Sequence, residues 1–201
     1  LLNIISSYLK PQEGSLNING VIRTVFQKDG LFPWLTVAEN ISMGLQSIQM
    51  ASQREKELDE LLSMIQMEQF RDHYPHQLSG GMRQKVELAR ALAGDSNVLL
   101  MDEPFSSLDY QTRLRLRKEL VLLLAKRCRT VIFVTHDIEE AAQLADRLLV
   151  LSDRPARIRD EFCIDIPKPR NITDPRVTEV VRNILKRMGL QTKEKTNDCL
   201  I

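Results

Sequence analysis

Residues 98–103 read Val98-Leu99-Leu100-Met101-Asp102-Glu103, and this stretch decides the fold. Four consecutive apolar residues are typical of a strand that is buried on both faces, as the strands of a parallel sheet are. Two adjacent carboxylates directly after it would lie beyond the carboxyl end of the strand, where open α/β sheets bind their ligands. The stretch therefore predicts a buried parallel strand that leads into a binding site.

Strands and helices alternate around this stretch. The pattern predicts strands over residues 21–26, 130–134 and 148–151, and helices over 1–5, 110–128, 137–144 and about 174–188. Alternation of this kind is typical of a parallel sheet with right-handed crossovers. A further strand is expected at 15–19, where polar and apolar residues alternate before Asn19-Gly20, a pair typical of hairpin turns.

Residues 36–93 follow a helical pattern throughout. Thr36 and Glu39 have the spacing of a capping box, and apolar residues recur on one face of helices expected over 52–66 and 79–93. We therefore expect one α/β domain with two parts. They are a parallel-sheet core flanked by helices, made of residues 1–35 and 94–201, and an inserted α-helical subdomain over 36–93.

Composition restricts the class of protein. Lys and Arg together number 28 and Asp and Glu 27 in 201 residues, so the net charge of +1 offers no basic surface for nucleic acid. Cys128, Cys163 and Cys199 form neither a disulfide framework nor a CxxC metal pair, which favours a reducing compartment. The longest apolar run, residues 120–125, is far too short to cross a bilayer.

Polar residues follow three of the expected strands: Gln27, the pair Asp102-Glu103, and His136. Because neighbouring strands lie about 4.8 Å apart, these side chains can converge on one ligand. A carboxylate there suits Mg²⁺ held with a phosphate ester, and a second one can orient a water for attack on a phosphoryl group. Taken singly, the acids also fit a solvated strand end, Gln27 a turn cap and His136 a helix cap.

Ser79-Gly80-Gly81 opens one of the expected helices. A serine N-cap, two glycines that allow close approach of a ligand to the backbone, and the helix dipole together favour an anion site. An ordinary glycine-rich helix start would look the same. Trp34, beside Pro33 in a loop, suits either an interface or the packing of a turn. The basic residues of 110–129 are expected to form a solvated helix face.

Five short motifs resemble those of the ATP-binding cassette (ABC) ATPases, and they stand along the chain in the family's order. Leu78-Ser79-Gly80-Gly81-Met82-Arg83-Gln84 resembles the signature motif, and residues 98–104 resemble the Walker B segment. Gln27 matches the Q-loop glutamine, Ser107-Leu108-Asp109 the D-loop, and His136 the switch histidine. The resemblance covers nearly the whole chain and implies the core of a P-loop NTPase with ATP and Mg²⁺ as cofactors.

The resemblance also implies a role for each matching residue. Glu103 would polarise the attacking water, Asp102 and Gln27 would serve Mg²⁺, and His136 would contact the γ-phosphate. A second group of residues would act across a two-fold, head-to-tail homodimer that sandwiches two ATP molecules. In that dimer Ser79, Gly80 and Gly81 would close on the nucleotide of the partner subunit, and Asp109 would link the two sites.

Further stretches resemble the importers of nitrate, sulfonates and taurine. They are residues 31–40, Leu31-Phe32-Pro33-Trp34-Leu35-Thr36-Val37-Ala38-Glu39-Asn40, together with 153–158 and 166–170. The resemblance implies a peripheral subunit on the cytoplasmic face of the membrane that meets a permease through residues 28–36. It would act indirectly with a solute-binding protein, and no nucleic-acid partner is expected.

The family's phosphate cradle, GxxxxGK[ST], does not occur in these 201 residues. The resemblance implies that the chain begins just after that motif, so that the strand before it and the aromatic residue that stacks on adenine are also missing. We expect the 201 residues alone to bind ATP poorly and to hydrolyse it negligibly. Two alternatives are a soluble ABC ATPase that acts on DNA or ribosomes, and a non-catalytic fragment that occupies a partner's interface.

Overall fold

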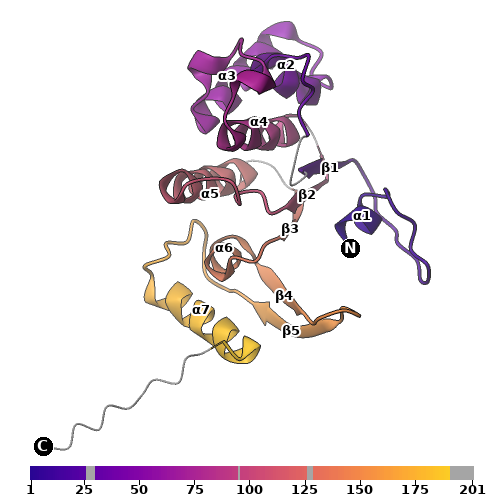
Figure 1. The fold of residues 1–201 in the computed structure, drawn as a ribbon, viewed down its shortest axis with the longest axis vertical. Helices are drawn as coiled ribbons and strands as arrows, with labels where there is room; N and C mark the ends of the chain where they lie inside the picture. Colours follow the sequence, from indigo (N-terminus) through magenta and orange to yellow (C-terminus); the bar gives the residue numbers. More distant parts are fainter. Residues whose placement is uncertain (26–29, 95, 126–128, 191–201) are drawn as a thin grey trace, which may run out of the picture. The chain divides into compact units, whose positions relative to one another are not determined.

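The computed structural model describes residues 1–25, 30–94, 96–125 and 129–190. They divide into two compact units, a first unit Leu1–His136 and a second unit Asp137–Ile201 (Figure 1). Gln27 therefore lies outside the described residues. Among the described residues, no helix is both long enough and apolar enough to cross a membrane.

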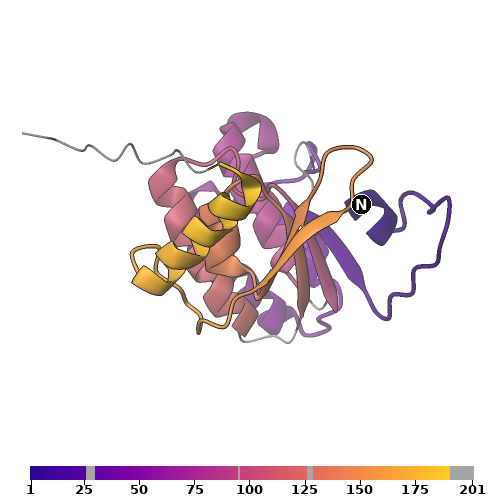
Figure 2. The ribbon, with the colours of Figure 1, turned by 90° about the horizontal axis from the view of Figure 1, so that it is seen from below.

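A three-stranded parallel sheet forms the centre of the first unit. Its strands are β1 (Ile22–Val25), β2 (Val98–Asp102) and β3 (Thr130–Val134), in the order β1-β2-β3, and they run side by side in Figure 2. The central strand is the apolar stretch quoted above, and Leu99, Leu100 and Met101 are all buried. The predicted fold class, an α/β protein with a parallel sheet, is confirmed.

Helices occupy residues 37–92 of the first unit. They are α2 (Val37–Ser42), η1 (Met43–Leu45), α3 (Ala51–Ile65), η2 (Glu68–Phe70), η3 (Pro75–Gln77) and α4 (Gly80–Leu92). The predicted capping box is present, since the Thr36 hydroxyl accepts from the Glu39 N–H and the Glu39 carboxylate accepts from the Thr36 N–H at 2.7 Å. The cluster of α2, α3 and α4 stands at one end of this unit, beyond the sheet (Figure 1).

The beginning of the chain differs from the prediction. α1 (Leu2–Ile5) is a single turn of helix at the predicted place. Residues 15–19, however, form no strand in the described part of the chain. The predicted hairpin is therefore wrong, because these exposed residues pair with no second strand there. β1 instead pairs in parallel with β2 over Ile22 to Val25.

The second unit contains a separate two-stranded sheet. Its elements are α6 (Ile138–Leu144), β4 (Arg147–Leu151), β5 (Ile158–Cys163) and α7 (Pro175–Met188). The strand expected at 148–151 is present, but it pairs antiparallel with β5 and not with the parallel sheet. An apolar run indicates burial without fixing the direction of pairing. The consecutive charged residues Arg159-Asp160-Glu161 hid β5 from the sequence prediction.

One arginine of the basic helix α5 (Tyr110–Ala125) also differs from expectation. The Arg117 side chain is buried, and its guanidinium lies 5.9 Å from the centre of the Phe105 ring. The planar, weakly hydrated guanidinium can stack on an aromatic face, which an ammonium does less well. Arg117 therefore belongs to the packing between α5 and the segment after β2, not to a solvated face.

Candidate active site

The parallel pairing of β2 with β3 brings two of the predicted catalytic residues together. Asp102 is in register with Val134 at the ends of these strands, and the Glu103 N–H donates to the Val134 carbonyl at 2.9 Å. The next residues of both strands therefore lie at one edge of the sheet. Glu103 Oε1 is 3.0 Å from His136 Nδ1, and His136 is 77% exposed while the Glu103 side chain is 25% exposed.

Glu103 holds an unusual backbone conformation. Its φ of +47° lies in the left-handed region, which residues other than glycine rarely adopt. The Glu103 carbonyl is fixed by three donors: Gln84 Nε2 at 3.1 Å, Ser106 N at 3.1 Å and Ser106 Oγ at 3.0 Å. Backbone strain of this kind persists where the surrounding contacts over-determine it, and it gathers at functional sites.

The glycine-rich turn is exposed at the start of α4. Ser79 is the N-cap, and its Oγ accepts from the Met82 N–H at 3.3 Å. A Cβ built on Gly80 would meet nothing within 4 Å, whereas a Cβ on Gly81 would lie 3.3 Å from the Ser107 carbonyl oxygen. The absence of a side chain at Gly80 is therefore not required by the packing of the described residues.

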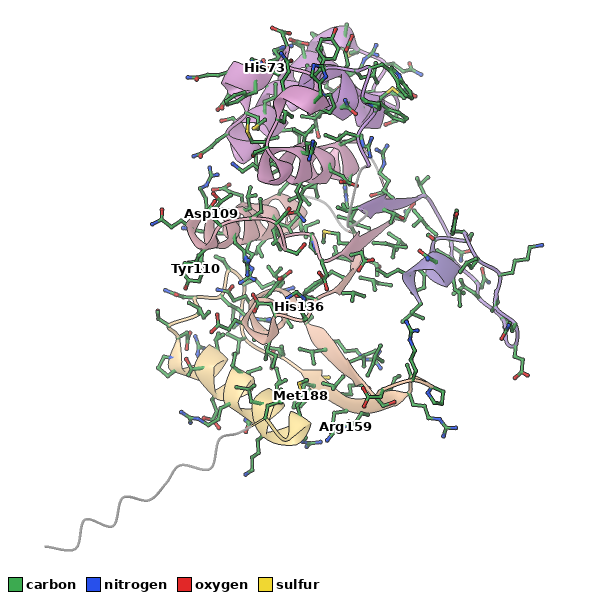
Figure 3. All side chains as sticks on the ribbon, viewed as in Figure 1. His73, Asp109, Tyr110, His136, Arg159 and Met188 are labelled. Carbon is green, nitrogen blue, oxygen red and sulfur yellow. The ribbon has the colours of Figure 1, made fainter. Side chains whose placement is uncertain are left out.

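Asp109 is the N-terminal cap of α5, where Figure 3 labels it. Its carboxylate accepts from the Thr112 N–H at 3.0 Å, and this hydrogen bond holds the pKa of Asp109 below its usual value. The side chain is thus ionised and aimed along the first turn of the helix. This local role was not part of the sequence prediction, although the Asp109-Tyr110 helix start carried the signal.

The fit of a metal ion depends on Asp102. Among the residues that the structure describes, no group of three His, Cys, Asp or Glu side chains could hold a metal ion by itself. Mg²⁺ in nucleotide sites needs only one or two protein carboxylates, because phosphate oxygens and waters complete its shell. The Asp102 carboxylate, half-buried at the end of β2, fits that requirement.

Two buried amides escaped the sequence prediction. Gln84, on α4, contacts both Glu103 and Ser107, and Asn40, on α2, organises the loop that carries Trp34. Each occupies a helix position that an apolar pattern assigns to the core, but one polar residue in such a pattern is not enough to identify a hydrogen-bonding network.

Asn40 closes the loop at residues 32–36. Its Nδ2 donates to the carbonyls of Phe32 at 3.1 Å and Leu35 at 2.9 Å, and its Oδ1 accepts from the Phe32 N–H at 2.9 Å. The ring centres of Phe32 and Trp34 are 5.5 Å apart, and Trp34 remains 68% exposed. The buried amide therefore fixes the backbone of a loop that presents an aromatic side chain to its surroundings.

An edge of parallel strands that carries an Asp-Glu pair and a histidine, in a unit with a serine- and glycine-opened helix, defines an ATP-hydrolysing cassette domain. The comparisons agree: the family described as ABC transporter matches residues 1–106. The chain belongs to this family, and as its ATPase domain it is a transport-coupled, ATP-hydrolysing enzyme.

Two relatives and one solved structure illustrate the match. An uncharacterised ABC transporter ATP-binding protein of Methanocaldococcus jannaschii is 41% identical over 92% of this chain and 73% of its own length. A nitrate import ATP-binding protein of Synechocystis is 40% identical over 86% of this chain and 70% of its own length. A dimeric ABC cassette in a post-hydrolysis state bound to ADP and Pi aligns with a TM-score of 0.71 and 32% identity, over 83% of this chain and 80% of that one.

Replacing Asn40 by Ala should destabilise the protein by about 2 kcal/mol, because burial leaves the Phe32 and Leu35 backbone groups without their partner. Chemical denaturation followed by circular dichroism measures this loss. The matched control is Asn183→Ala on the exposed side of α7, which should change the free energy of unfolding by less than about 0.5 kcal/mol. Equal effects of the two variants would contradict the role of Asn40.

Proposed function

We propose that this chain is the ATP-binding and ATP-hydrolysing subunit of an importer that powers uptake of a solute of the nitrate, sulfonate or taurine kind through a membrane permease. The observation that carries the proposal is the Glu103–His136 pair, 3.0 Å apart at adjacent strand ends. Family membership and the similarity to a nitrate import protein support it.

Glu103 acts as the base in this proposal. The backbone of its turn is held through the Glu103 carbonyl, and its carboxylate lies 3.0 Å from His136 Nδ1 at the edge of the sheet. A carboxylate placed there accepts a hydrogen bond from the attacking water and orients it toward the γ-phosphate. The exposed His136 ring, on the other strand end, contacts the γ-phosphate and completes the site.

Asp102 and Gln27 hold Mg²⁺ in this proposal, together with oxygens of the nucleotide. The ion would neutralise charge on the transferred phosphoryl group. Asp102 reaches this place because β2 ends in it, one residue before Glu103. Gln27 comes two residues after Val25, the last residue of the strand that pairs with β2, although the described residues do not include it.

The exposed turn Ser79–Gly81 faces the nucleotide of a second copy in this proposal. The N-terminal N–H groups of α4 offer an anion site, and the open space beside Gly80 admits a phosphate close to the backbone. Two copies in a head-to-tail, two-fold dimer would then complete each other's sites, with Asp109 between them. The solved cassette similar to this chain is dimeric.

The permease contact falls on residues 28–36. Exposed Trp34, whose ring is tilted by 43° against that of Phe32 on a loop that Asn40 closes, offers an aromatic anchor, and aromatic residues are enriched in protein interfaces. Through this contact the subunit would lie on the cytoplasmic face of the membrane and act indirectly with a solute-binding protein.

Glu103→Gln in the full-length protein should abolish ATP turnover and trap ATP in a closed dimer, because the amide cannot take a proton from the attacking water. Phosphate release measures turnover, and size-exclusion chromatography with ATP measures the dimer. Glu60→Gln, an exposed change on α3, is the control. Unchanged turnover of the Glu103→Gln variant would show that Glu103 is not the base.

Gly80→Ala should leave the free energy of unfolding unchanged or raise it by up to about 1 kcal/mol, because alanine favours helix and meets no neighbour. ATP-dependent dimerisation and turnover should nevertheless fall, since the new methyl group occupies the approach to the backbone. Gly81→Ala is the comparison, and it should lower stability as well through contact with Ser107. Full dimerisation by the Gly80 variant would show that this glycine does not face a nucleotide.

The 201 residues printed here, expressed alone, should bind ATP weakly and turn it over negligibly, because they contain no GxxxxGK[ST] cradle. Isothermal titration calorimetry and phosphate release measure both properties. The control is the same chain joined behind a segment that carries a GxxxxGK[ST] motif. Turnover by the 201 residues at the rate of that fusion would disprove the expectation.

A further inference from the structure

We propose that Gln84 is a positioning residue that couples the signature turn Ser79–Gly81 to the base Glu103 within one subunit. The inference rests on the proposed function, because it assigns Gln84 an effect on the same reaction. Gln84 is buried, with 6% of its surface exposed, and it lies in α4 three residues after Gly81.

The Gln84 amide joins two segments that flank the turn after β2. Its Nε2 donates to the Glu103 carbonyl at 3.1 Å, and its Oε1 accepts from the Ser107 N–H at 3.1 Å and from the Ser107 hydroxyl. Both ends of the amide are therefore used, so the side chain has one orientation. A buried amide with both ends occupied fixes the groups that it bridges.

The backbone conformation of Glu103 explains why its contact with Gln84 would affect the position of the proposed base. The residue sits at a φ of +47°, and nothing in its own side chain favours that conformation. The β3 backbone holds its N–H, whereas Gln84 and Ser106 hold its carbonyl. Loss of the Gln84 contact would let the peptide after Glu103 rotate, and the carboxylate would then leave its place beside His136.

The same contacts reach the signature turn. Gln84 follows Gly80 and Gly81 by one turn of a continuous helix, so a displacement of the helix start moves the amide with it. A Cβ built on Gly81 would lie 3.3 Å from the carbonyl oxygen of Ser107, the residue whose N–H the amide holds. Binding of a phosphate at Ser79–Gly81 would therefore affect the position of Glu103 through one turn of α4 and the Gln84 side chain.

The test uses two variants of Gln84 in the full-length protein. Gln84→Met removes all three hydrogen bonds of the amide at similar volume. Gln84→Glu keeps an acceptor for the Ser107 N–H but cannot donate to the Glu103 carbonyl when ionised. Both should lower kcat by about tenfold or more while the KM for ATP stays within about twofold, because a small misplacement of a reacting group affects the chemical step alone.

A double-variant measurement separates positioning from a general loss of structure. In a Glu103→Gln background, adding Gln84→Glu should cause no further loss of the residual turnover, since the group that Gln84 positions is already gone. The matched control is Gln143→Met, which replaces another buried glutamine, on α6. It should leave kcat within about twofold of wild type. If Gln84→Met fails to fold, the outcome with Gln84→Glu decides.

The outcomes distinguish the two proposals. Wild-type turnover in Glu103→Gln alone would overturn the proposed function. Loss of turnover in Glu103→Gln together with wild-type kcat in Gln84→Glu would overturn only the positioning role. A rise in KM without a fall in kcat, or losses that multiply in the double variant, would also overturn it, because either result assigns Gln84 to binding or to stability.

Discussion

The parallel register of β2 and β3 is the constraint on which the site depends. Asp102 and Val134 lie opposite each other, so the chain leaves both strands at the same edge of the sheet. Glu103 and His136, 33 positions apart in sequence, consequently stand 3.0 Å apart. A slip of one residue in this register would turn alternate side chains to the other face and separate the pair.

This register also explains how much of the fold and of the candidate site could be predicted from the sequence. The apolar run at 98–101, the capping box at Thr36, the cap at Ser79, and the polar residues after β2 and β3 are local signals, and the structure contains them. Once the strands are parallel, the meeting of Glu103 with His136 follows from geometry without further information. Local signals therefore defined most of the described catalytic edge.

What could not be predicted are contacts whose partners are distant in sequence. The antiparallel pairing of β4 with β5, and the absence of a strand at 15–19 among the described residues, depend on which partner is available, which periodicity does not encode. Buried polar residues pose the same difficulty. Gln84, Asn40 and Arg117 are polar residues that become buried, and the hydrogen bonds or ring contact that accompany their burial are not visible in the sequence.

The two adjacent glycines of the signature turn, Gly80 and Gly81, differ in the space that surrounds them. At Gly81 the demand is internal, because a methyl group would press on the Ser107 carbonyl that belongs to the turn after Glu103. At Gly80 the described chain makes no such demand, and a glycine there costs helix stability relative to alanine. Under the proposed function, a phosphate that approaches the exposed start of α4 would use the space that Gly80 leaves open. Gly81 thus fits the helix to the turn after Glu103, while Gly80 leaves the start of the helix open.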